Sequence, residues 1–498
     1  MRSNNKLISL TMFLVLIGYN ACDESRLDVA PQSQTEDSYF KQEVEFERAV
    51  TGIYAKLTDF YWYNRSADAC LQPVTLLPGD DITTNGQDAF ETFSGIQTGT
   101  QRLADFFSTA YQLINRAIVV MDKNAEVEDG VYVTPGLKDY HRGEALFLRA
   151  YGYYLLWNIF GTAPLVTARV DNLNDTKPPS STGTQLLDQA ILDLTEAATL
   201  LPTSWAEAQR GRVTKNSAYG LLGKCLVFKG TITNSPADYQ AAITAFDNIS
   251  GASLVPAFDD NFAADTENNE ESLFEYQATR AFGDDNIWLN NDFDNAVGAL
   301  SVFWGYYSDQ FNLFGKSPFV ATQKLADLFD DTDPRKELSL DPDTRAFKKY
   351  VTRDELNQGG SSSVNNPRIL RYADVLLLKA EALNESGGST ADAIAQINLV
   401  RERARGAGTV PADRPSTETD REIIRQWIMD ERLLELAGEG QRWFDLRRWA
   451  LGEKITLDDG FFSSDRPNAM GFEKKNLYFP IPNSETNVNP NIIPNPGY

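Results

Sequence analysis

The densest group of chemically capable side chains lies between Asp430 and Trp449, in the stretch DERLLELAGEGQRWFDLRRW. Charged residues are interspersed there with leucines and aromatics: Glu431, Arg432, Glu435, Glu439, Arg442, Asp445, Arg447 and Arg448. A buried charge is tolerable only when it is paired. The stretch is therefore either an active site or an ion-paired corner. We favour the corner, because charged helix faces are commoner than catalytic ones.

The apolar residues of this stretch indicate two short helices that meet at Gly438-Glu439-Gly440. Glycine is the residue that most often interrupts a helical pattern. Each helix has an apolar side at helical spacing: Leu433, Leu434, Leu436 and Ala437 in the first, and Trp443, Phe444, Leu446 and Trp449 in the second. These helices would position the charged residues.

Other familiar catalytic patterns are absent from the sequence. There is one histidine, His141, and no Ser or Cys motif accompanies it. No phosphate-binding GxxxxGK[ST] loop, HExxH or CxxC pattern occurs. Cys225 lies in an apolar helical run, which predicts a buried small hydrophobe, and a disulfide to Cys70 stays open. These absences give no motif that indicates an enzyme or a cofactor.

Oxygen-rich segments leave two alternatives open. Asp80-Asp81, Asp330-Asp331 and the acidic run 259–271 could hold a structural calcium ion, although solvated loop acids are commoner. A glycosidase needs only two carboxylates ~5–10 Å apart, and the sequence has many acids. No stretch singles out such a pair, so glycoside hydrolysis is an alternative rather than the prediction.

Aromatic residues outside helical stripes indicate a binding surface. Tyr61-Trp62-Tyr63-Asn64 lies in one irregular segment, which Asp80 and Asp81 follow. A second segment contains Trp288, Trp304, Tyr306, Tyr307 and Asp309. Sugar rings stack on Trp and Tyr, and their hydroxyls bond to Asp, Asn and Arg. A single loop aromatic is more often packed in its own loop, but the two segments together favour sugar binding.

Charge and composition exclude several classes of partner. The 498 residues include 70 acidic and 46 basic side chains, for a net charge of −24. Nucleic acid binding needs clustered Lys and Arg, so we predict no such partner. The same balance disfavours a protein held by anionic lipid. Since the chain exceeds ~250–300 residues, more than one lobe is expected.

The N-terminus predicts export and a lipid anchor. Arg2 and Lys6 precede the apolar run Leu7 to Ile17, and a small residue, Ala21, comes before Cys22. This order is typical of a secretory signal, here residues 1–21. A cysteine directly after the cleavage point is the arrangement of a bacterial lipoprotein, although Tyr19-Asn20 departs from the usual residues. Several acyl chains on Cys22 would give a stable anchor in lipid.

The remaining chain predicts an all-α fold with irregular inserted loops. Apolar residues at three- and four-residue steps indicate helices beginning near Gln42 and over residues 103–121, 141–160, 186–201, 215–229, 238–249, 368–383, 391–403, 421–437 and 441–450. Several form pairs with small residues at the contacts, like a tetratricopeptide-type solenoid of ~34-residue units. The Pro- and Asn-rich C-terminal tail should run along the surface as turns and extended chain.

We divide the chain accordingly. Residues 22–40 form a tether, 41–250 an N-terminal helical region, 251–366 a loop-rich insertion and 367–498 a C-terminal region of helix pairs with the tail. The insertion carries part of the predicted binding surface.

The chain resembles the SusD/RagB family of outer-membrane lipoproteins of Bacteroidetes. The resemblance spans nearly the whole chain and rests on several segments in order: LDVAPQSQTEDSYF, EFERAVTGIYAKL, RGEALFLRAYGYYLLWNIFGTAPLV, KNSAYGLLGKCLVFKG, Asp333-Pro334-Arg335, RYADVLLLKAEALNESGG with INLVRERA, DERLLELAGEGQRWFDLRRW and IPNSETNVNPNIIPNPGY.

The resemblance implies a tetratricopeptide-like helical scaffold that captures a glycan at the cell surface. It also implies a SusC-like TonB-dependent transporter as partner, for which the protein would act as a lid, without catalysis. Some family members bind other nutrients, such as peptides. Ligand contacts of the family fall near Asp80-Asp81 and Arg280 through Trp288. Together with the loop aromatics, these positions give the candidate contacts Trp62, Asp80, Asp81, Arg280, Asn286, Trp288, Trp304, Tyr306 and Tyr307.

Overall fold

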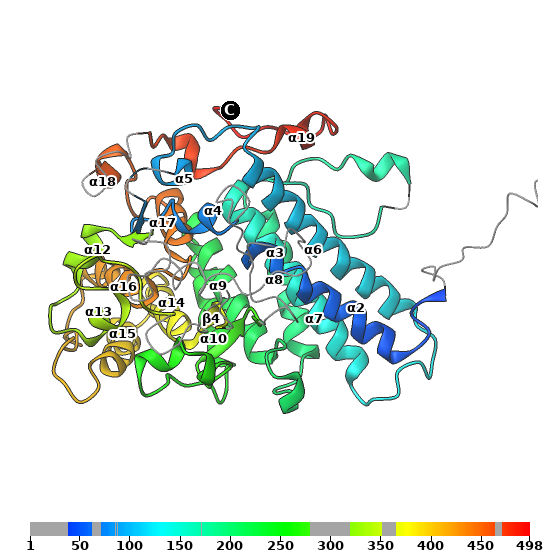
Figure 1. Cartoon of the computed structure of the whole chain (residues 1–498). Coiled ribbons are helices and arrows are strands. Elements are labelled where there is room, and N and C mark those ends of the chain that lie inside the picture. Colours follow the sequence, from blue (N-terminus) through cyan, green and yellow to red (C-terminus); the bar gives the residue numbers. More distant parts are fainter. Residues whose placement is uncertain are drawn as a thin grey trace, which may run out of the picture.

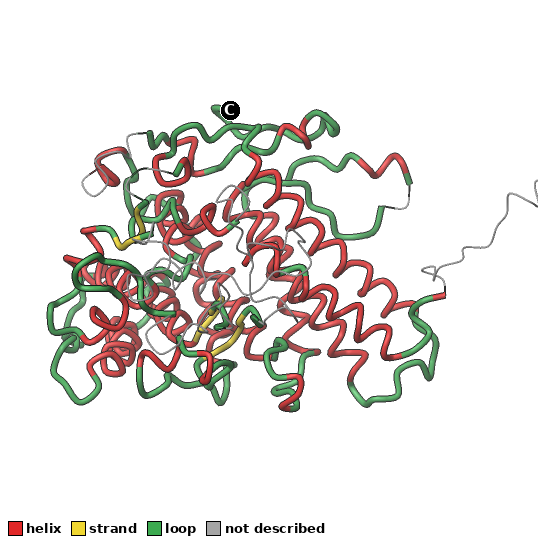
Figure 2. The backbone as a smooth tube through the Cα atoms, in the orientation of Figure 1, coloured by secondary structure: helices red, strands yellow, loops and turns green. Residues whose placement is uncertain are grey.

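The computed structural model describes residues 38–61, 71–84, 86, 88–170, 172–278, 319–350, 365–463 and 471–498. Helices dominate these residues, and strands form only two short ribbons (Figure 2). The predicted fold class is confirmed. None of the described helices has the length and apolar composition to cross a bilayer.

The N-terminal half is a layer of long helices (Figure 1). Its helices are α2 (Glu43–Ala55), α6 (Gln101–Glu126), α7 (Leu137–Phe160), α8 (Gln185–Leu200), α9 (Lys215–Thr233) and α10 (Pro236–Asp247), with short α3 (Thr58–Tyr61), α4 (Gln72–Leu76) and α5 (Ala89–Thr92) between α2 and α6. Helix α7 is buried along nearly its whole length, as its apolar circumference predicts. It packs against α2, α6 and α8.

The C-terminal half continues the same array of packed helices. It contains α14 (Tyr372–Glu385), α15 (Thr390–Arg405), α16 (Arg421–Leu436) and α17 (Arg442–Leu451), followed by short α18 (Asp459–Ser463) and α19 (Asn483–Thr486). Helix α10 packs directly on α14, so the array passes across the insertion that separates them in sequence. This arrangement fits the predicted solenoid of helix pairs.

The turn between α9 and α10 shows how the sequence defines a helix pair. Asn234 adopts a left-handed conformation with φ 50°, and the Ser235 side chain accepts from the Asp238 N–H. Pro236 then occupies the first turn of α10, where a missing N–H costs nothing. Gly223 on α9 lies so close to Phe246 that a Cβ would clash at 2.2 Å, so the glycine allows the close approach.

Two antiparallel ribbons connect the insertion to the scaffold. Strand β1 (Ile82–Thr83) pairs with β3 (Val320–Ala321), and β2 (Ser272–Glu275) pairs with β4 (Arg368–Arg371). The insertion also contributes α12 (Gln323–Leu328) and α13 (Pro334–Ser339). The prediction of a helix from Arg368 was wrong for its first turn. Residues 368–371 pair with β2 instead, so the helix begins at Tyr372.

The C-terminal tail crosses the top of the molecule in Figure 1. Its backbone bonds to distant segments, with Phe479 N–H donating to Ile159 O at 3.0 Å and Asn483 N–H donating to Thr98 O at 2.9 Å. Apart from the one-turn helix α19 and a 3₁₀ turn at 474–477, it is extended chain and turns, as predicted.

Candidate functional site

The corner between α16 and α17 has the geometry that its glycines predict. Gly438 and Gly440 have φ angles of 74° and 77°, values that side-chain-bearing residues rarely adopt. They reverse the chain between the two helices. The Gly438 N–H donates to Asp81 Oδ2 at 3.0 Å, which ties the corner to a distant loop.

Three arginine side chains converge on the carboxylate of Glu435. Its carboxylate accepts from Arg371 Nη1 at 2.9 Å and Arg335 Nη1 at 3.1 Å, and also from Arg403. The side chain is fully buried. Burial raises the pKa of the Glu435 carboxyl, but the three guanidinium groups and Lys349 outweigh it and lower the pKa to about 2. Glu435 is therefore ionised in the interior.

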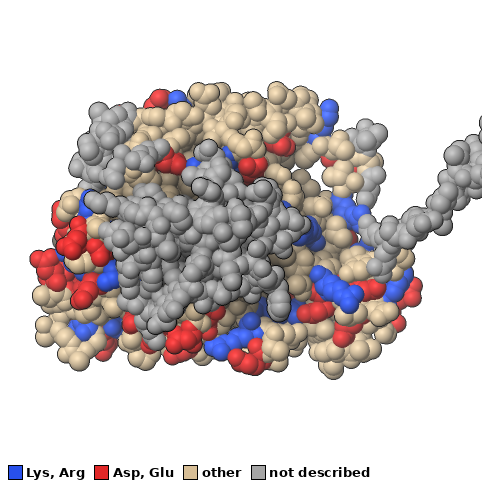
Figure 3. Space-filling view, viewed as in Figure 1, with Lys and Arg blue, Asp and Glu red and all other residues tan. Residues whose placement is uncertain are grey.

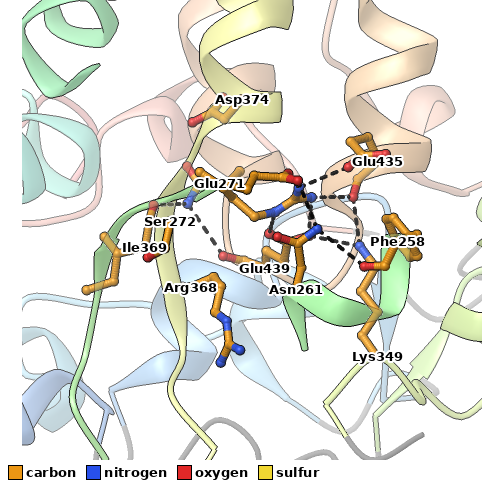
Figure 4. Close-up of polar contacts among 12 residues, drawn as sticks. Phe258, Asn261, Glu271, Ser272, Lys349, Arg368, Ile369, Asp374, Glu435 and Glu439 are labelled. Atoms are coloured by element: carbon orange, nitrogen blue, oxygen red, sulfur yellow. Dashed lines mark hydrogen bonds and ion pairs between the residues drawn. The ribbon is translucent and has the colours of Figure 1, made fainter. Parts of the chain in front are cut away.

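Glu439 and Glu271 extend this network into the insertion (Figure 4). Glu439 accepts from Arg371 Nε at 2.7 Å and from Lys349 Nζ at 2.9 Å. Glu271 accepts from Arg371 Nη1 and Arg403 Nη1, both at 2.7 Å. Burial raises the pKa of Glu439, and Arg371 and Lys349 lower it further than burial raises it. One buried network thus joins the corner, β4, α15 and the insertion.

A second network lies along α17. Arg432 donates to Asp374 and Asp445, each at 2.7 Å, and Arg448 donates to Asp445 and Glu381. Lys224 of α9 donates to Asp374 at 2.7 Å. These contacts join α9, α14, α16 and α17 through groups that are all buried.

This geometry favours the structural interpretation of the corner. A general acid needs a raised pKa, whereas the carboxyl groups of Glu435, Glu439 and Asp445 have lowered ones. Their oxygens bond to Arg and Lys side chains in the interior. The corner is an ion-paired joint between helices.

The structure corrects the prediction for Asp80 and Asp81. Both side chains are buried, each 1% exposed. Asp80 accepts from Arg442 Nη2 at 3.1 Å and pairs with Lys324 Nζ at 2.7 Å. Burial raises the pKa of the Asp81 carboxyl to about 6. Because both carboxyl groups lie inside and contact the joint, we no longer propose them as direct ligand contacts.

The described framework brings the ends of the candidate loops together. The Tyr61 ring, next to Trp62, stacks on Tyr276 with ring centroids 5.3 Å apart. Tyr276 lies just before the segment that contains Arg280, Asn286 and Trp288. Thr58 Oγ1 and Tyr276 Oη are 3.1 Å apart. The first aromatic segment therefore begins next to the residues that precede Arg280, Asn286 and Trp288 in the insertion.

Two family models match the chain. One, described as "SusD family", matches residues 330–498, and the other, described as "Starch-binding associating with outer membrane", matches residues 27–226. Together they span most of the sequence. SusD-like protein P2 of Formosa agariphila is 27% identical over 99% of both chains. The chain belongs to the SusD-like family.

Solved SusD-like structures share the fold. A SusD homolog from Bacteroides thetaiotaomicron has a TM-score of 0.77 at 21% identity, covering 93% of this chain and 99% of that one. Surface glycan-binding protein A from the same organism, in complex with laminarihexaose, has a TM-score of 0.71 at 20% identity, covering 91% and 99%. At these identities the likeness concerns the fold.

Most of the predicted SusD-like site lies outside the described residues. This holds for the predicted lipidation site Cys22 and for Trp62, Arg280, Asn286, Trp288, Trp304, Tyr306 and Tyr307. The structure describes residues on either side of these segments, such as Tyr61 and Tyr276. The positions of those residues are what the structure contributes to the site.

His141 and Cys225 lie in the interior, where their contacts are those of structural residues. The His141 ring is buried, with Nδ1 2.9 Å from Tyr132 Oη and Nε2 2.8 Å from Glu47. Cys225 is buried and free, and burial raises the pKa of its thiol to about 12. Among the described residues, no three His, Cys, Asp or Glu side chains are grouped to hold a metal ion, so the calcium alternative gains no support there.

Sequence reasoning missed the three arginines that contact Glu435 from other segments. Arg335, Arg371 and Arg403 lie far from Glu435 in sequence, and local periodicity does not relate them. One signal was present: in Asp333-Pro334-Arg335, Asp333 Oδ2 holds the Arg335 guanidinium at 2.8 Å, which directs Arg335 toward Glu435.

Proposed function

We propose that this SusD-like protein binds oligosaccharides at the bacterial cell surface and passes them to a SusC-like TonB-dependent transporter, for which it acts as a lid. Family membership carries the proposal, because it extends over both halves of the chain. The model matching residues 27–226 is described as starch-binding and associated with the outer membrane. A structural neighbour was solved with laminarihexaose.

The framework supports placing the binding surface on the inserted loops. The flanks of the segments that contain Trp62 and Trp288 meet at the Tyr61–Tyr276 stack. Aromatic side chains from both segments could then act on one ligand, since sugar faces stack on such rings. On the face that Figure 3 shows, acidic and basic side chains are interspersed over the described surface.

Calorimetric titration against a glycan panel tests the binding proposal. The panel contains laminarin, starch oligosaccharides and a mixed peptide digest, titrated into wild type, Trp288→Ala and Trp304→Ala. We expect a glycan to bind wild type, and each substitution to weaken binding by about 1–3 kcal/mol, the loss of one stacking anchor. Trp205→Ala, in the loop between α8 and α9, is the matched control and should bind normally.

Two results would redirect the assignment. Equal affinity of wild type and both loop variants would remove Trp288 and Trp304 from the site. Binding of the peptide digest alone would favour a peptide nutrient, and release of reducing ends from a bound glycan would favour the hydrolase alternative.

The proposed anchor is an acylated Cys22 in the outer-membrane lipid. Cys22→Ala should move the protein from the membrane to the soluble fraction, because stable attachment needs the acyl chains. Cys225→Ala, which leaves the N-terminus intact, should stay with the membrane. Detergent extracts of the wild-type membrane should yield a co-purified TonB-dependent transporter. Retention of Cys22→Ala in membranes would contradict the anchor.

A further inference from the structure

A small pocket lies where α3, α4, α7, α9, the β2–β4 ribbon and the corner meet. Its volume is about 60 Å³, and most of its wall is aromatic or aliphatic. Among the lining residues, Tyr61, Thr75, Gly440 and Gln441 are partly exposed, and the others are buried. The pocket therefore extends from a partly accessible edge into the core.

Polar atoms without a partner among the described residues line this apolar wall. Gln72 on α4 is 3% exposed, and neither its amide oxygen nor its amide nitrogen has a hydrogen-bond partner in the described part of the chain. The Tyr154 hydroxyl on α7 is likewise buried without one. Lys224 Nζ donates to Asp374 at 2.7 Å and to Gln441 Oε1 at 2.6 Å, which accounts for two of its three N–H donors.

The hydrogen-bond donors and acceptors of these atoms indicate which kind of molecule the pocket can hold. The Gln72 amide offers two donors and an acceptor, and the Tyr154 hydroxyl offers one donor and two acceptor lone pairs. A hydrocarbon would leave all of them unsatisfied, which is costly in the interior. A monatomic anion would leave the Gln72 amide oxygen without a donor, and a monatomic cation would leave the N–H donors of Gln72 and Lys224 without an acceptor. A neutral molecule that both donates and accepts fits, and the volume admits more than one water molecule, since one needs about 10–15 Å³ of such space.

We propose that the pocket is a structural hydration site, in which ordered water molecules bridge Gln72 and Tyr154 and accept from the remaining Lys224 donor. The waters would join α4, α7 and α9 beside the corner, where direct side-chain contacts leave these atoms unsatisfied. This role is independent of the ligand and of the transporter.

High-resolution crystal structures of the full chain test the proposal. Wild type should show ordered water within hydrogen-bond distance of both Gln72 and Tyr154. Tyr154→Phe, which removes a single oxygen, should lose the water on that side and keep the fold. Gln72→Leu should lose the water on the other side. An empty pocket in wild type, or density for a larger organic molecule, would overturn the assignment.

Urea unfolding of the same variants gives a second readout. In a dry pocket, Gln72→Leu would remove two unsatisfied polar atoms from the core and lower the unfolding constant by roughly tenfold or more. In a hydrated pocket the substitution also removes bonds to water, so we expect no such decrease. Gln97→Leu, at an exposed position, is the control for the substitution itself. A tenfold stabilisation confined to Gln72→Leu would contradict the hydration site.

Discussion

Glu435 shows how a carboxylate remains charged in the core of this molecule. Desolvation opposes its ionisation, and the attraction of Arg403, Arg371 and Arg335 exceeds that penalty. Removal of one partner from such a network leaves a buried charge without compensation, which typically costs about 3–5 kcal/mol. The charge of Glu435 therefore serves to stabilise the fold rather than to take part in a reaction.

We expect the stability that Glu435 contributes to depend on pH. Its pKa falls from 4.5 in the unfolded chain to about 2 in the folded protein, so the folded state binds its proton less readily. The contribution, about 3 kcal/mol, is therefore present above pH 4.5 and is lost as the pH falls toward 2. Urea unfolding of wild type and Glu435→Gln across this range measures it.

The difference between the two unfolding free energies isolates the titration of Glu435. It should be largest above about pH 5 and shrink below pH 4.5, since glutamine does not titrate. Glu128→Gln, at an exposed position, is the control and should change the unfolding free energy only slightly. A wild-type advantage that stays the same from pH 6 to pH 3 would show that the carboxylate is not stabilised by its partners.

At the scale of elements, the corner between α16 and α17 depends on two glycines with different surroundings. Both have positive φ angles. A Cβ on Gly438 would meet the Phe347 ring at 2.9 Å, whereas a Cβ on Gly440 would have its nearest neighbour at 3.6 Å. Backbone strain therefore applies to both positions, and a steric clash applies to Gly438 alone.

Alanine substitution should separate these two effects. A left-handed conformation costs a side-chain-bearing residue about 1–2 kcal/mol. Gly440→Ala should lose about that amount of unfolding free energy, and Gly438→Ala should lose more. Gly387→Ala is the matched control, because its φ is 79° and its Cβ would contact nothing within 4 Å. Equal losses for Gly438→Ala and Gly387→Ala in urea unfolding would mean that Phe347 moves away without cost.

The elements that sequence could predict are those with a local signal. Periodic apolar residues located α6, α7, α8, α9 and α10 to within a few residues, and Gly438 and Gly440 located the corner. The first turn predicted at Arg368 failed because pairing with β2, almost a hundred residues earlier, outweighed helical periodicity. Partners of Glu435 and the interior position of Asp80 also depend on such distant contacts, which no window of sequence contains.

At the scale of the whole molecule, Asp80 is where three distant segments meet. It belongs to the N-terminal region, and its partners Arg442 and Lys324 come from the corner and the insertion. Burial raises the pKa of the Asp80 carboxyl, but Arg442 and Lys324 lower it well below its usual range. The N-terminal loop, the insertion and the C-terminal joint are thus held together by one ionised group.

Arg442→Ala should destabilise the whole chain without removing its ligand site. Asp80 would keep only the partly exposed Lys324 as a cationic partner, so we expect a loss of about 3 kcal/mol and a lower melting temperature. Arg142→Ala removes an arginine whose partner Glu196 is exposed, and should have a much smaller effect. Calorimetry and glycan titration of each variant measure both quantities.

The two measurements distinguish a joint from a binding group. If Arg442 acts only through Asp80, the folded fraction of Arg442→Ala should bind glycan with wild-type affinity, because the proposed stacking residues are on other segments. A variant that melts like wild type but no longer binds would return the corner to the ligand site. Lower stability with unchanged affinity would support glycan binding by the loops that begin next to Tyr61 and Tyr276.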